Sequence, residues 1–302
     1  MTPLPAALPV DLSGRALTRI SDLAPAELEA ILDLADELKR LHATREPHRL
    51  LEGRTLGLLF RKHSTRTRVS LEAGMAQLGG TALYLPGTEL QVERGESLGD
   101  TARVLSRYLD ALAVRTHAQA EVDELAATAS IPVVSALTDE EHPLQALADL
   151  QTVRERFGTL EGVRVAWIGD GSNVCASLAG ACRLLGVDFA CASPPGYEAP
   201  GVAVVRDPCD AARGAHVLVT DVWTSMGQEA EAARRARDLA PYALGAKLLA
   251  LADPDAIVLH CLPAHAGEEI AADILYGPRS AVWDEAENRL HTAKALLALV
   301  CS

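Results

Sequence analysis

The hydrophobic positions of the chain predict strands and helices that alternate along its length. In residues 25–42 the apolar side chains recur at helical spacing, and Pro25 suits the first turn of a helix. Short apolar runs then predict strands at 55–60, 81–85, 111–115, 132–136, 163–169, 187–192, 216–223 and 256–262. Helical patterns separate these runs, from about Thr65 and near 99–109, 119–129, 142–157, 173–185 and 228–240, and a last one covers 285–300. Such alternation is typical of parallel sheets with helices on both faces.

The long helical pattern at 142–157 divides this alternation into two series. A chain of 302 residues also exceeds the usual size of a single domain. We therefore predict an α/β fold of two domains, each a parallel sheet flanked by helices, with the active site in a cleft between them. The predicted first domain is 1–146, the second is 147–284, and a C-terminal helix of about 285–302 is expected to pack back on the first.

Composition narrows the possible functions. With 49% apolar and 23% charged residues, the chain has the make-up of an ordinary globular protein. Its net charge of −13 argues against a nucleic-acid partner, because a protein that binds the phosphate backbone needs a basic face. No apolar stretch is long enough for a membrane span, and the N-terminus lacks the pattern of a secretory signal. Any anionic substrate is therefore expected to meet a local basic pocket.

The six cysteines predict neither disulfides nor a metal centre. They are Cys175, Cys182, Cys191, Cys209, Cys261 and Cys301, and they show no CxxC pair and no zinc-ligand spacing. A chain of this size does not need disulfides for its stability. We therefore expect reduced thiols, a cytoplasmic location and no bound metal.

A run of hydroxyl and guanidinium groups predicts an anion site after the first strand. The run 64–68, Ser-Thr-Arg-Thr-Arg, follows the predicted strand 55–60 and opens a helix. Unpaired amides and the helix dipole favour negative charge at a helix N-terminus, and arginine adds a forked donor that fits phosphate. An ordinary helix cap with solvated arginines is the alternative.

Three further polar residues stand where open α/β sheets bind their ligands. Arg115 ends a predicted strand, while His142 and Gln145 open the long helix on either side of Pro143. Taken singly, each of them could equally be a structural or a surface residue.

The turn 167–173 resembles a dinucleotide-binding loop but lacks two of its features. Val174 stands where the third glycine is needed, and no acidic residue ends the next predicted strand. We therefore give little weight to a dinucleotide-dependent oxidoreductase. A tight turn from strand to helix that presents Asn173 is the better interpretation.

Two loops after predicted strands carry further candidate groups. In 221–229, Asp221 and Ser225 follow an apolar strand, and a carboxylate with a hydroxyl suits an α-ammonium group; turn formation is the alternative. In His-Cys-Leu-Pro, Cys261 ends the last strand, although a buried cysteine there is usually inert. Arg279 is one more guanidinium, in a Gly/Pro loop.

Together these segments closely resemble the ornithine carbamoyltransferases, from about residue 54 to 293. The Ser-Thr-Arg-Thr-Arg motif is common to the wider transcarbamylase family. His-Pro-x-Gln, Asp-x-x-x-Ser-Met-Gly and His-Cys-Leu-Pro point to the ornithine branch, and Ser-Met-Gly discriminates best. The resemblance implies transfer of the carbamoyl group of carbamoyl phosphate to the δ-amine of L-ornithine, which gives L-citrulline and phosphate.

The resemblance also implies a role for each residue of these motifs. Ser64, Thr65, Arg66 and Thr67 would hold the phosphate; Arg115, His142 and Arg279 would polarise the carbonyl oxygen; Gln145 and the backbone around Cys261 and Leu262 would hold the amide of carbamoyl phosphate. Asn173, Asp221, Ser225 and Met226 match positions that bind the α-carboxylate and α-ammonium groups of ornithine, with Cys261 beside its δ-nitrogen. Gln91 matches a loop residue that reaches the phosphate of the neighbouring subunit in the family's homotrimer. Arg94 and Gly95 depart from the family pattern in that loop, where a His-Lys or similar pair is expected.

The expected chemistry needs neither a metal nor a cofactor. Carbamoyl phosphate is a mixed anhydride with a good leaving group, so orientation and charge stabilisation suffice for direct attack. Transfer to another amine, such as putrescine, an N-acylated ornithine or aspartate, is the nearest alternative, and Ser-Met-Gly argues against it. A non-catalytic amino-acid-binding protein would share Asp221 and Asn173 but would have no use for a separate phosphate site.

Overall fold

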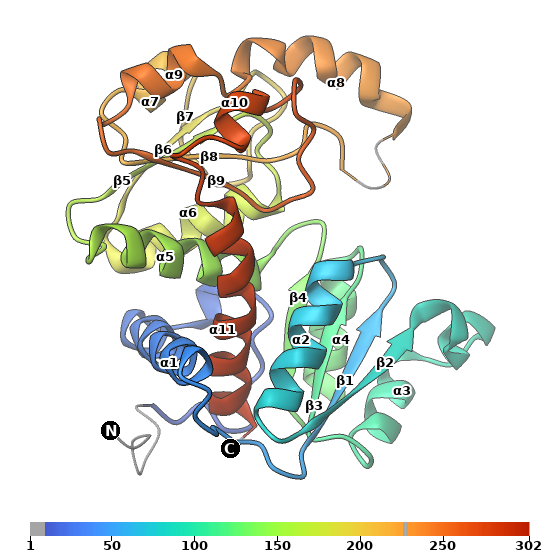
Figure 1. The fold of residues 1–302 in the computed structure, drawn as a ribbon. Coiled ribbons are helices and arrows are strands. Elements are labelled where there is room, and N and C mark those ends of the chain that lie inside the picture. The colour runs from blue at the N-terminus through green and yellow to red at the C-terminus, as the bar shows by residue number, and fades with distance from the viewer. Residues whose placement is uncertain (1–9, 226, 228, 302) are drawn as a thin grey trace. The chain divides into compact units, whose positions relative to one another are not determined.

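The computed structural model describes residues 10–225, 227 and 229–301. The chain forms two compact units, each built around its own parallel sheet (Figure 1). Unit 1 runs to Gln151 and resumes at Asn288, and unit 2 is Thr152–Glu287.

The chain passes from one unit to the other inside two helices. These are α5 (Pro143–Phe157) and α11 (Val282–Val300), so each of them begins in one unit and ends in the other. The predicted boundaries, 146/147 and 284/285, lie within the same two helices.

Unit 1 contains a parallel sheet, as predicted. Its strands are β1 (Thr55–Phe60), β2 (Thr81–Pro86), β3 (Ala111–Arg115) and β4 (Val133–Leu137), in the order β2-β1-β3-β4. β3 and β4 are buried along their whole length, which accounts for their continuous apolar sequences. From β1 the next strand, β2, is added on one side of the sheet, whereas β3 and β4 are added on the other side. The direction of strand addition therefore reverses between β1 and β3, which makes this a topological switch point. Ligands of open α/β sheets bind at the carboxyl ends of the strands beside such a point.

The helices of unit 1 follow the predicted patterns. They are α1 (Pro25–Ala43), α2 (Thr65–Gln77), α3 (Leu98–Leu105) and α4 (Gln119–Thr128), with 3-10 turns η1 (Ile20–Asp22), η2 (Gly87–Glu89) and η3 (Gln91–Arg94). In α1, Pro25 occupies the first turn and the predicted apolar stripe is buried. α2 begins at its predicted cap, where Ser64 Oγ accepts a hydrogen bond from the Thr67 amide at 3.2 Å. α3 is shorter than predicted, because its pattern continues into a turn at 106–108.

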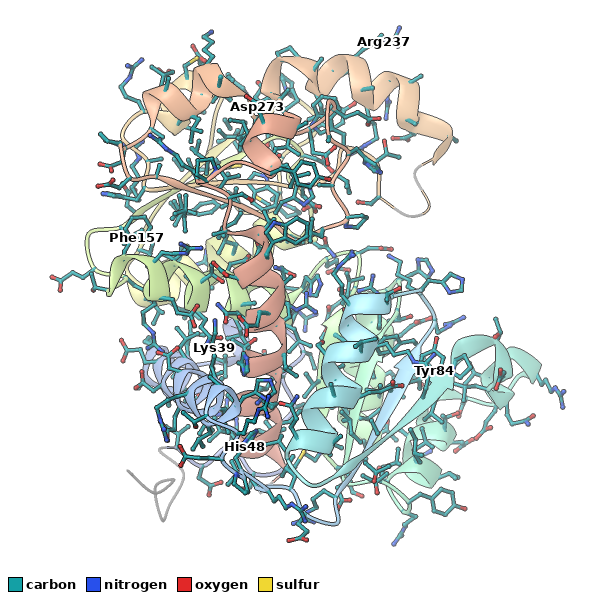
Figure 2. The ribbon with its side chains drawn as sticks, in the orientation of Figure 1. Lys39, His48, Tyr84, Phe157, Arg237 and Asp273 are labelled. Carbon is teal, nitrogen blue, oxygen red and sulfur yellow. The ribbon has the colours of Figure 1, made fainter. Side chains whose placement is uncertain are left out.

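The part of α11 in unit 1 carries polar side chains into the interior. Lys39 Nζ of α1 donates to Asn288 Oδ1 at 2.7 Å. Lys294 Nζ lies 3.2 Å from His48 Nε2 and 2.9 Å from Gln77 Oε1, and Figure 2 shows Lys39 and His48 beside this helix. Because a buried ammonium without hydrogen-bond partners is costly, these contacts allow Lys294 to be fully buried.

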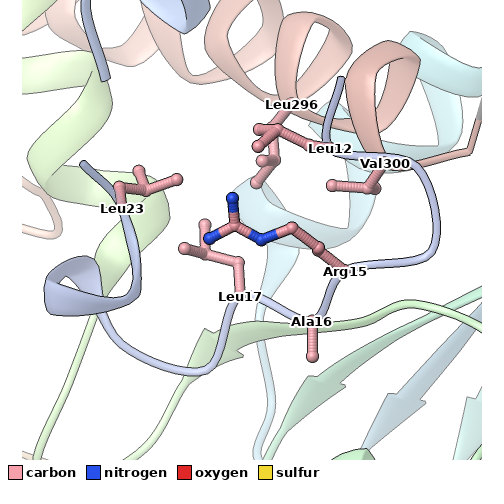
Figure 3. Close-up of a pocket in the computed structure, with 7 residues that line it drawn as sticks. All are labelled: Leu12, Arg15, Ala16, Leu17, Leu23, Leu296 and Val300. Atoms are coloured by element: carbon pink, nitrogen blue, oxygen red, sulfur yellow. The ribbon is translucent and has the colours of Figure 1, made fainter. Parts of the chain in front are cut away.

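A small cavity of unit 1 lies between the N-terminal segment and α11 (Figure 3). Its volume is about 10 Å³, and it is lined by Leu12, Arg15, Ala16, Leu17, Leu23, Leu296 and Val300. The Arg15 guanidinium lies at this cavity and donates to the carbonyl oxygen of Asp22 at 2.8 Å. A cavity of this size holds at most one water molecule, so it is too small for a substrate.

Unit 2 contains a second parallel sheet. Its strands are β5 (Arg164–Ile168), β6 (Asp188–Ala192), β7 (Val204–Val205), β8 (Val217–Thr220) and β9 (Ile257–His260), in the order β7-β6-β5-β8-β9. The switch point of this sheet lies between β5 and β8. The sequence did not predict β7, because an edge strand of two residues is too short to show a hydrophobic pattern.

The helices of unit 2 are of unequal length. They are α6 (Asn173–Leu185), α7 (Pro208–Ala212), α8 (Ala232–Leu239), α9 (Ala246–Leu251) and α10 (Ala272–Leu275), with 3-10 turns η4 (Glu229–Glu231) and η5 (Ala240–Tyr242). α6 has the bounds that the sequence predicted. α7, α9 and α10 are too short for a helical period to appear in the sequence, and they were not predicted. Among the described residues, no helix combines the length and the hydropathy that a membrane span requires.

Candidate active site

The switch point of unit 1 gathers the first group of predicted site residues. Ser64 to Thr67 begin α2 just after β1, and Arg115 is the last residue of β3, where it pairs in register with Phe60 of β1. The N-terminus of α2 and the backbone of Arg115 therefore lie at the same edge of the sheet. Amides at a helix start and a nearby arginine together favour an anion at this edge.

Arg289 of α11, which was not among the predicted site residues, contacts several of them. Its Nη2 donates to Thr67 Oγ1 at 3.1 Å, and its Nη1 donates to Gln145 Oε1 and lies 3.3 Å from His142 Nε2. All four side chains are buried. We call Ser64 to Thr67, Arg115, His142, Gln145 and Arg289 the unit 1 cluster.

His142 is a neutral imidazole in this cluster. Burial, together with the positive charges of Arg289 and Arg115, holds the pKa of His142 well below its usual value. Because a guanidinium can only donate hydrogen bonds, the contact with Arg289 makes His142 Nε2 the acceptor and places the ring proton on Nδ1. His142 can therefore act as a hydrogen-bond donor through Nδ1 without carrying a charge.

The carboxamide of Gln145 is oriented from both sides. Its Nε2 donates to Asp149 Oδ1, one turn further along α5, at 2.8 Å, and its Oε1 accepts from Arg289. A carboxylate only accepts and a guanidinium only donates, so the amide group can adopt one orientation. The buried Asp149 was not among the predicted residues.

Gln91 lies in η3, in the loop segment of unit 1 between β2 and α3, and its side chain is exposed. Gly95 ends η3 with φ +96°, a left-handed conformation that favours glycine. The departure from the family pattern at Gly95 therefore has a local structural reason. The predicted role of Gln91 toward a neighbouring subunit stays a prediction.

The switch point of unit 2 gathers the second group. Asn173 is the first residue of α6, at the end of the turn that follows β5. A Cβ atom on Gly171 would lie 2.2 Å from the Ala199 backbone nitrogen, so only glycine fits this tight turn. Gly171 also donates its amide to the Tyr197 carbonyl at 2.7 Å, which fixes the turn against the 194–199 segment.

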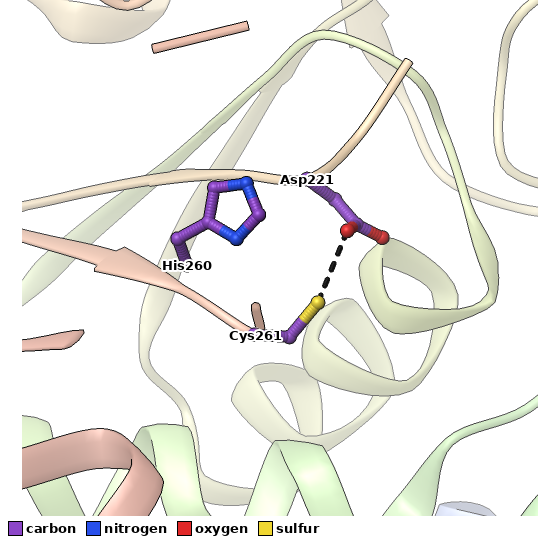
Figure 4. Close-up of side chains that lie close together, drawn as sticks. All are labelled: Asp221, His260 and Cys261. Carbon is purple, nitrogen blue, oxygen red and sulfur yellow. Dashed lines mark hydrogen bonds between the residues drawn. The ribbon is translucent and has the colours of Figure 1, made fainter. Parts of the chain in front are cut away.

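Asp221 follows β8, and its carboxylate accepts hydrogen bonds from two nearby groups. Its Oδ2 accepts from Ser172 Oγ at 3.0 Å, and its Oδ1 accepts from the Val222 amide at 2.8 Å. Cys261, which follows β9, directs its thiol toward the same carboxylate at 3.0 Å (Figure 4). Asn173, Asp221 and Cys261, with Ser225, are called the unit 2 cluster.

His260 shapes the backbone next to Cys261. Its Nδ1 accepts from the Leu262 amide at 2.9 Å, so its Nε2 carries the proton and donates to Glu269, which is fully buried, at 3.1 Å. Leu262 has φ +56°, a strained value for this residue type. The imidazole thus helps to hold the turn whose backbone was predicted to bind the amide of the substrate.

Two groups in unit 2 bring possible metal ligands together. They are Asp221, His260 and Cys261, and His265, Glu268 and Glu269, with ligand atoms within 4.8 Å of one another in each group. Both ring nitrogens of His260 are engaged by Leu262 and Glu269, and the Cys261 thiol by Asp221. These contacts satisfy the first group as it stands, so its chemistry does not call for a metal.

Arg279 and Met226 remain outside these groupings, and Ser225 is assigned to the unit 2 cluster only because it lies in the loop that carries Asp221. Arg279 Nη1 donates to the Asp253 carbonyl at 3.5 Å, before the start of β9, whereas Cys261 follows the end of that strand. Arg279 is therefore separated from Cys261 by the length of β9, and it is not brought into either cluster. Ser225 is half-buried in the loop after β8, and Met226 lies outside the described residues.

Comparison with family models decides the family. Residues 15–155 match the carbamoyl-P binding domain of aspartate/ornithine carbamoyltransferases, and residues 161–300 match the Asp/Orn binding domain. The chain belongs to the aspartate/ornithine carbamoyltransferase family. The unit 1 cluster, except for Arg289, falls in the first matched domain, and the unit 2 cluster falls in the second.

Individual members of the carbamoyltransferase family are similar over nearly the whole chain. The ornithine carbamoyltransferase of Thermosynechococcus vestitus is 54% identical, over 95% of this chain and 96% of its own length. That of Methanoculleus marisnigri is 50% identical, over 92% and 94%. The solved ornithine carbamoyltransferase from Pyrococcus furiosus matches with a TM-score of 0.93 at 47% identity, covering 96% of this chain and 98% of that one.

Proposed function

We propose that this protein transfers the carbamoyl group of carbamoyl phosphate to the δ-amine of L-ornithine and releases L-citrulline and phosphate. The observation that carries the proposal is the pair of clusters at the two switch points, one suited to an anion and one to an α-amino acid. Relatives that are named ornithine carbamoyltransferase, at about half identity over almost the full length, support the choice of amine.

In the unit 1 cluster, the phosphate is proposed to bind at the start of α2. Ser64 to Thr67 supply hydroxyls and first-turn amides, and Arg66 adds a charged fork. Arg115, the Nδ1–H group of His142 and Arg289 are proposed to stabilise the oxyanion that develops on the carbamoyl group. Arg289 takes the role that the resemblance first gave to Arg279, because it contacts Thr67, His142 and Gln145.

In the unit 2 cluster, the α-ammonium group of ornithine is proposed to bind Asp221 and the α-carboxylate to bind near Asn173. Ser225 and Met226 complete this grip in the proposal, with Cys261 and the Leu262 backbone next to the reacting atoms. A carboxylate fixed by Ser172 and the Val222 amide is a rigid acceptor for an ammonium group.

The reaction itself is a direct displacement. The neutral δ-amine adds to the carbamoyl carbon, the C–O bond to phosphate breaks, and the amine proton leaves with the departing phosphate. Since an alkylammonium titrates near ~10.4, deprotonation at about pH 8 costs on the order of 3 kcal/mol. No covalent enzyme intermediate is needed, because phosphate is already a good leaving group.

A panel of amines tests the proposal. The purified protein is incubated with carbamoyl phosphate and with ornithine, putrescine, aspartate or N-acetylornithine, and the ureido product and the phosphate are both measured. We expect product with ornithine and little with the others. Product with a different amine would favour another transcarbamylase, and binding of ornithine without phosphate release would favour an amino-acid-binding protein.

We further propose that the protein works as a homotrimer in the cytoplasm. The family resemblance gives Gln91 a role in the neighbour's site, and six free cysteines suit a reducing compartment. Arg66→Ala and Gln91→Ala trimers, dissociated together and reassembled at random, are expected to recover about a quarter of wild-type activity, because every mixed ring has one intact site. Hybrids that show only the average of the two parents would contradict the role of Gln91.

A further inference from the structure

α8 in unit 2 is a mostly exposed helix with an arginine as its main anchor. Of its eight residues, Arg235 and Leu239 are buried, and they lie one turn apart on the same face. Leu239 packs with Tyr197 and Trp223. With so little apolar area against the rest of unit 2, the position of this helix depends on polar contacts, which include those of Arg235 and a hydrogen bond from the Tyr197 hydroxyl to Asp238 at 2.8 Å.

The Arg235 guanidinium binds two different segments. Its Nη2 lies 2.5 Å from Asp170 Oδ2 in a buried ion pair, and its Nε donates to the carbonyl oxygen of Trp223. The guanidinium carbon lies 4.9 Å from the centre of the Tyr197 ring, which adds a cation–π contact. Glu231 lies further away, 3.9 Å from Nη1.

These two segments carry the residues that are proposed to bind the α-ammonium and α-carboxylate groups of ornithine. Asp170 belongs to the turn after β5 that ends at Asn173, and Trp223 stands between Asp221 and Ser225 in the loop after β8. Thus one side chain connects the turn that carries Asn173 with the loop that carries Asp221 and Ser225.

We propose that Arg235 is a positioning residue that fixes these two segments relative to each other and so sets the affinity for the α-amino acid. This inference rests on the proposed function. Arg235 would not touch the substrate; it would act through Asp170 and the Trp223 carbonyl. Removing one partner of a buried ion pair leaves the other charge uncompensated. The hydrogen bond from Ser172 Oγ to Asp221 still joins the turn to the loop at 3.0 Å, so loss of Arg235 is expected to loosen the two segments relative to each other rather than to separate them.

The ion pair between Arg235 and Asp170 should also depend on pH, because it exists only while Asp170 is ionised. Burial raises the pKa of Asp170 to about 6; the positive charge of Arg235 opposes this, and the negative charge of Asp221 adds to it. Among the described residues, Arg235 faces Asp170 from α8 and Asp221 from the loop after β8, and the titratable Cys175 thiol of α6 also interacts with it. The ion pair with Arg235 therefore forms above about pH 6 and is lost below it, and without Arg235 the pKa of Asp170 would rise.

The decisive comparison is Arg235→Gln against Arg234→Gln. Arg234 is the exposed neighbour on α8, and its guanidinium forms an ion pair with Glu231 at 2.6 Å. We expect Arg235→Gln to raise the KM for ornithine by about tenfold or more and to leave the KM for carbamoyl phosphate within about twofold. Arg234→Gln should change neither constant.

Inhibition by L-norvaline reports binding of the α-ammonium and α-carboxylate groups separately from the reaction of the δ-amine. Norvaline has the same two α-groups as ornithine but no δ-amine. Its inhibition constant should rise with the ornithine KM in Arg235→Gln. In the wild type inhibition should weaken below about pH 6, where protonation of Asp170 breaks the ion pair, and in Arg235→Gln this pH-dependent weakening should be absent because the ion pair is already lost. Asp170→Asn combined with Arg235→Gln should be no worse than Arg235→Gln alone, since both remove one contact.

The outcomes distinguish the two levels of inference. If the wild type forms no ureido product from ornithine, the proposed function fails and this inference fails with it. If the wild type uses ornithine and Arg235→Gln keeps its ornithine KM, or weakens both substrates equally, only the role of Arg235 is overturned. Should Arg235→Gln fold poorly, Arg235→Lys is measured instead; it keeps the charge, cannot make both contacts, and is judged by the same criteria.

Discussion

Replacement of Arg289 by glutamine tests whether this arginine organises the unit 1 cluster. Arg289 is buried and donates to Thr67 Oγ1 and to Gln145 Oε1, and it lies 3.3 Å from His142 Nε2. The substitution removes the positive charge and shortens the side chain, so Thr67, Gln145 and His142 lose the donor that they share. We expect a folded protein that uses carbamoyl phosphate poorly.

The size of the effect follows from the two hydrogen bonds to oxygen. A hydrogen bond from a charged donor contributes about 1.5–3 kcal/mol, so the two together set an upper limit of about 6 kcal/mol. Water and the glutamine amide can replace part of this loss. We therefore expect about 2–4 kcal/mol, which corresponds to a loss of about 30- to 1,000-fold in kcat/KM for carbamoyl phosphate.

A lysine variant separates charge from geometry. Arg289→Lys keeps a positive charge near His142 but loses the forked donor, so it should also lose activity. The charge of Arg289 is one cause of the lowered pKa of His142. In Arg289→Gln the pKa of His142 should therefore rise, and in Arg289→Lys it should stay closer to that of the wild type.

Two measurements test whether Arg289 organises the unit 1 cluster. Steady-state kinetics give kcat/KM for both substrates, and the His142 ring signal, assigned with His142→Asn, is followed by NMR as the pH is changed. If Arg289→Gln keeps kcat/KM within about threefold and the titration of His142 is unchanged, the organising role of Arg289 is refuted.

Further outcomes are expected at other positions. Arg66→Ala should lower kcat/KM for carbamoyl phosphate by about 100-fold or more in a folded protein, and near-normal turnover would argue against the phosphate site. Asp221→Ala should raise the KM for ornithine far more than that for carbamoyl phosphate; equal weakening would contradict the division between the two clusters. At low ornithine the rate should rise with pH from neutral to alkaline, because only the neutral δ-amine attacks, and a flat profile would speak against direct attack. Burial lowers the pKa of Lys294 from 10.5 to about 8, so the unfolded chain binds more protons between these values and stability rises with pH. Lys294→Met should remove up to about 3 kcal/mol of this rise, measured by urea unfolding at about pH 7.5 and pH 10.

The parallel sheets could be predicted because most of their strands have a recognisable hydrophobic pattern in the sequence. β3 and β4 are buried on both faces, and so they appear in the sequence as unbroken apolar runs bounded by helical patterns. β7 is a pair of residues whose pairing with β6 depends on tertiary structure. No local pattern distinguishes such a pair from a loop.

Candidate site residues were visible where they follow strands. Arg115, Asp221 and Cys261 each come directly after or at the end of an apolar run, and in parallel sheets such positions share one edge. Arg279, in a loop with glycine and proline, looked similar in sequence, but its guanidinium reaches the Asp253 carbonyl before β9. Sequence order alone does not tell which end of a strand a long side chain approaches.

Arg289 was missed because it lies in the middle of a helix, where an arginine is ordinarily exposed. One signal was present: the polar residues Asn288, Arg289, His291, Thr292 and Lys294 surround the helix and leave no polar face distinct from an apolar one. A helix whose middle turns carry polar side chains on all sides, and which still packs in the interior, must find partners for these groups within the fold. Such a pattern is a reason to look for buried polar contacts, although it does not name the partner.

The protonation state of His142 shows why the chemistry of this cluster needed the three-dimensional structure. In the sequence, His142 could be neutral or charged, and a charged imidazole would seem a natural ligand for an anion. Burial beside two guanidinium groups excludes the charge, and the donor from Arg289 fixes the proton on Nδ1. Positive charge in the cluster thus comes from arginines, which stay protonated throughout the physiological range. His142 can contribute a directed hydrogen bond instead, and the strength of that bond should change little with pH near neutrality.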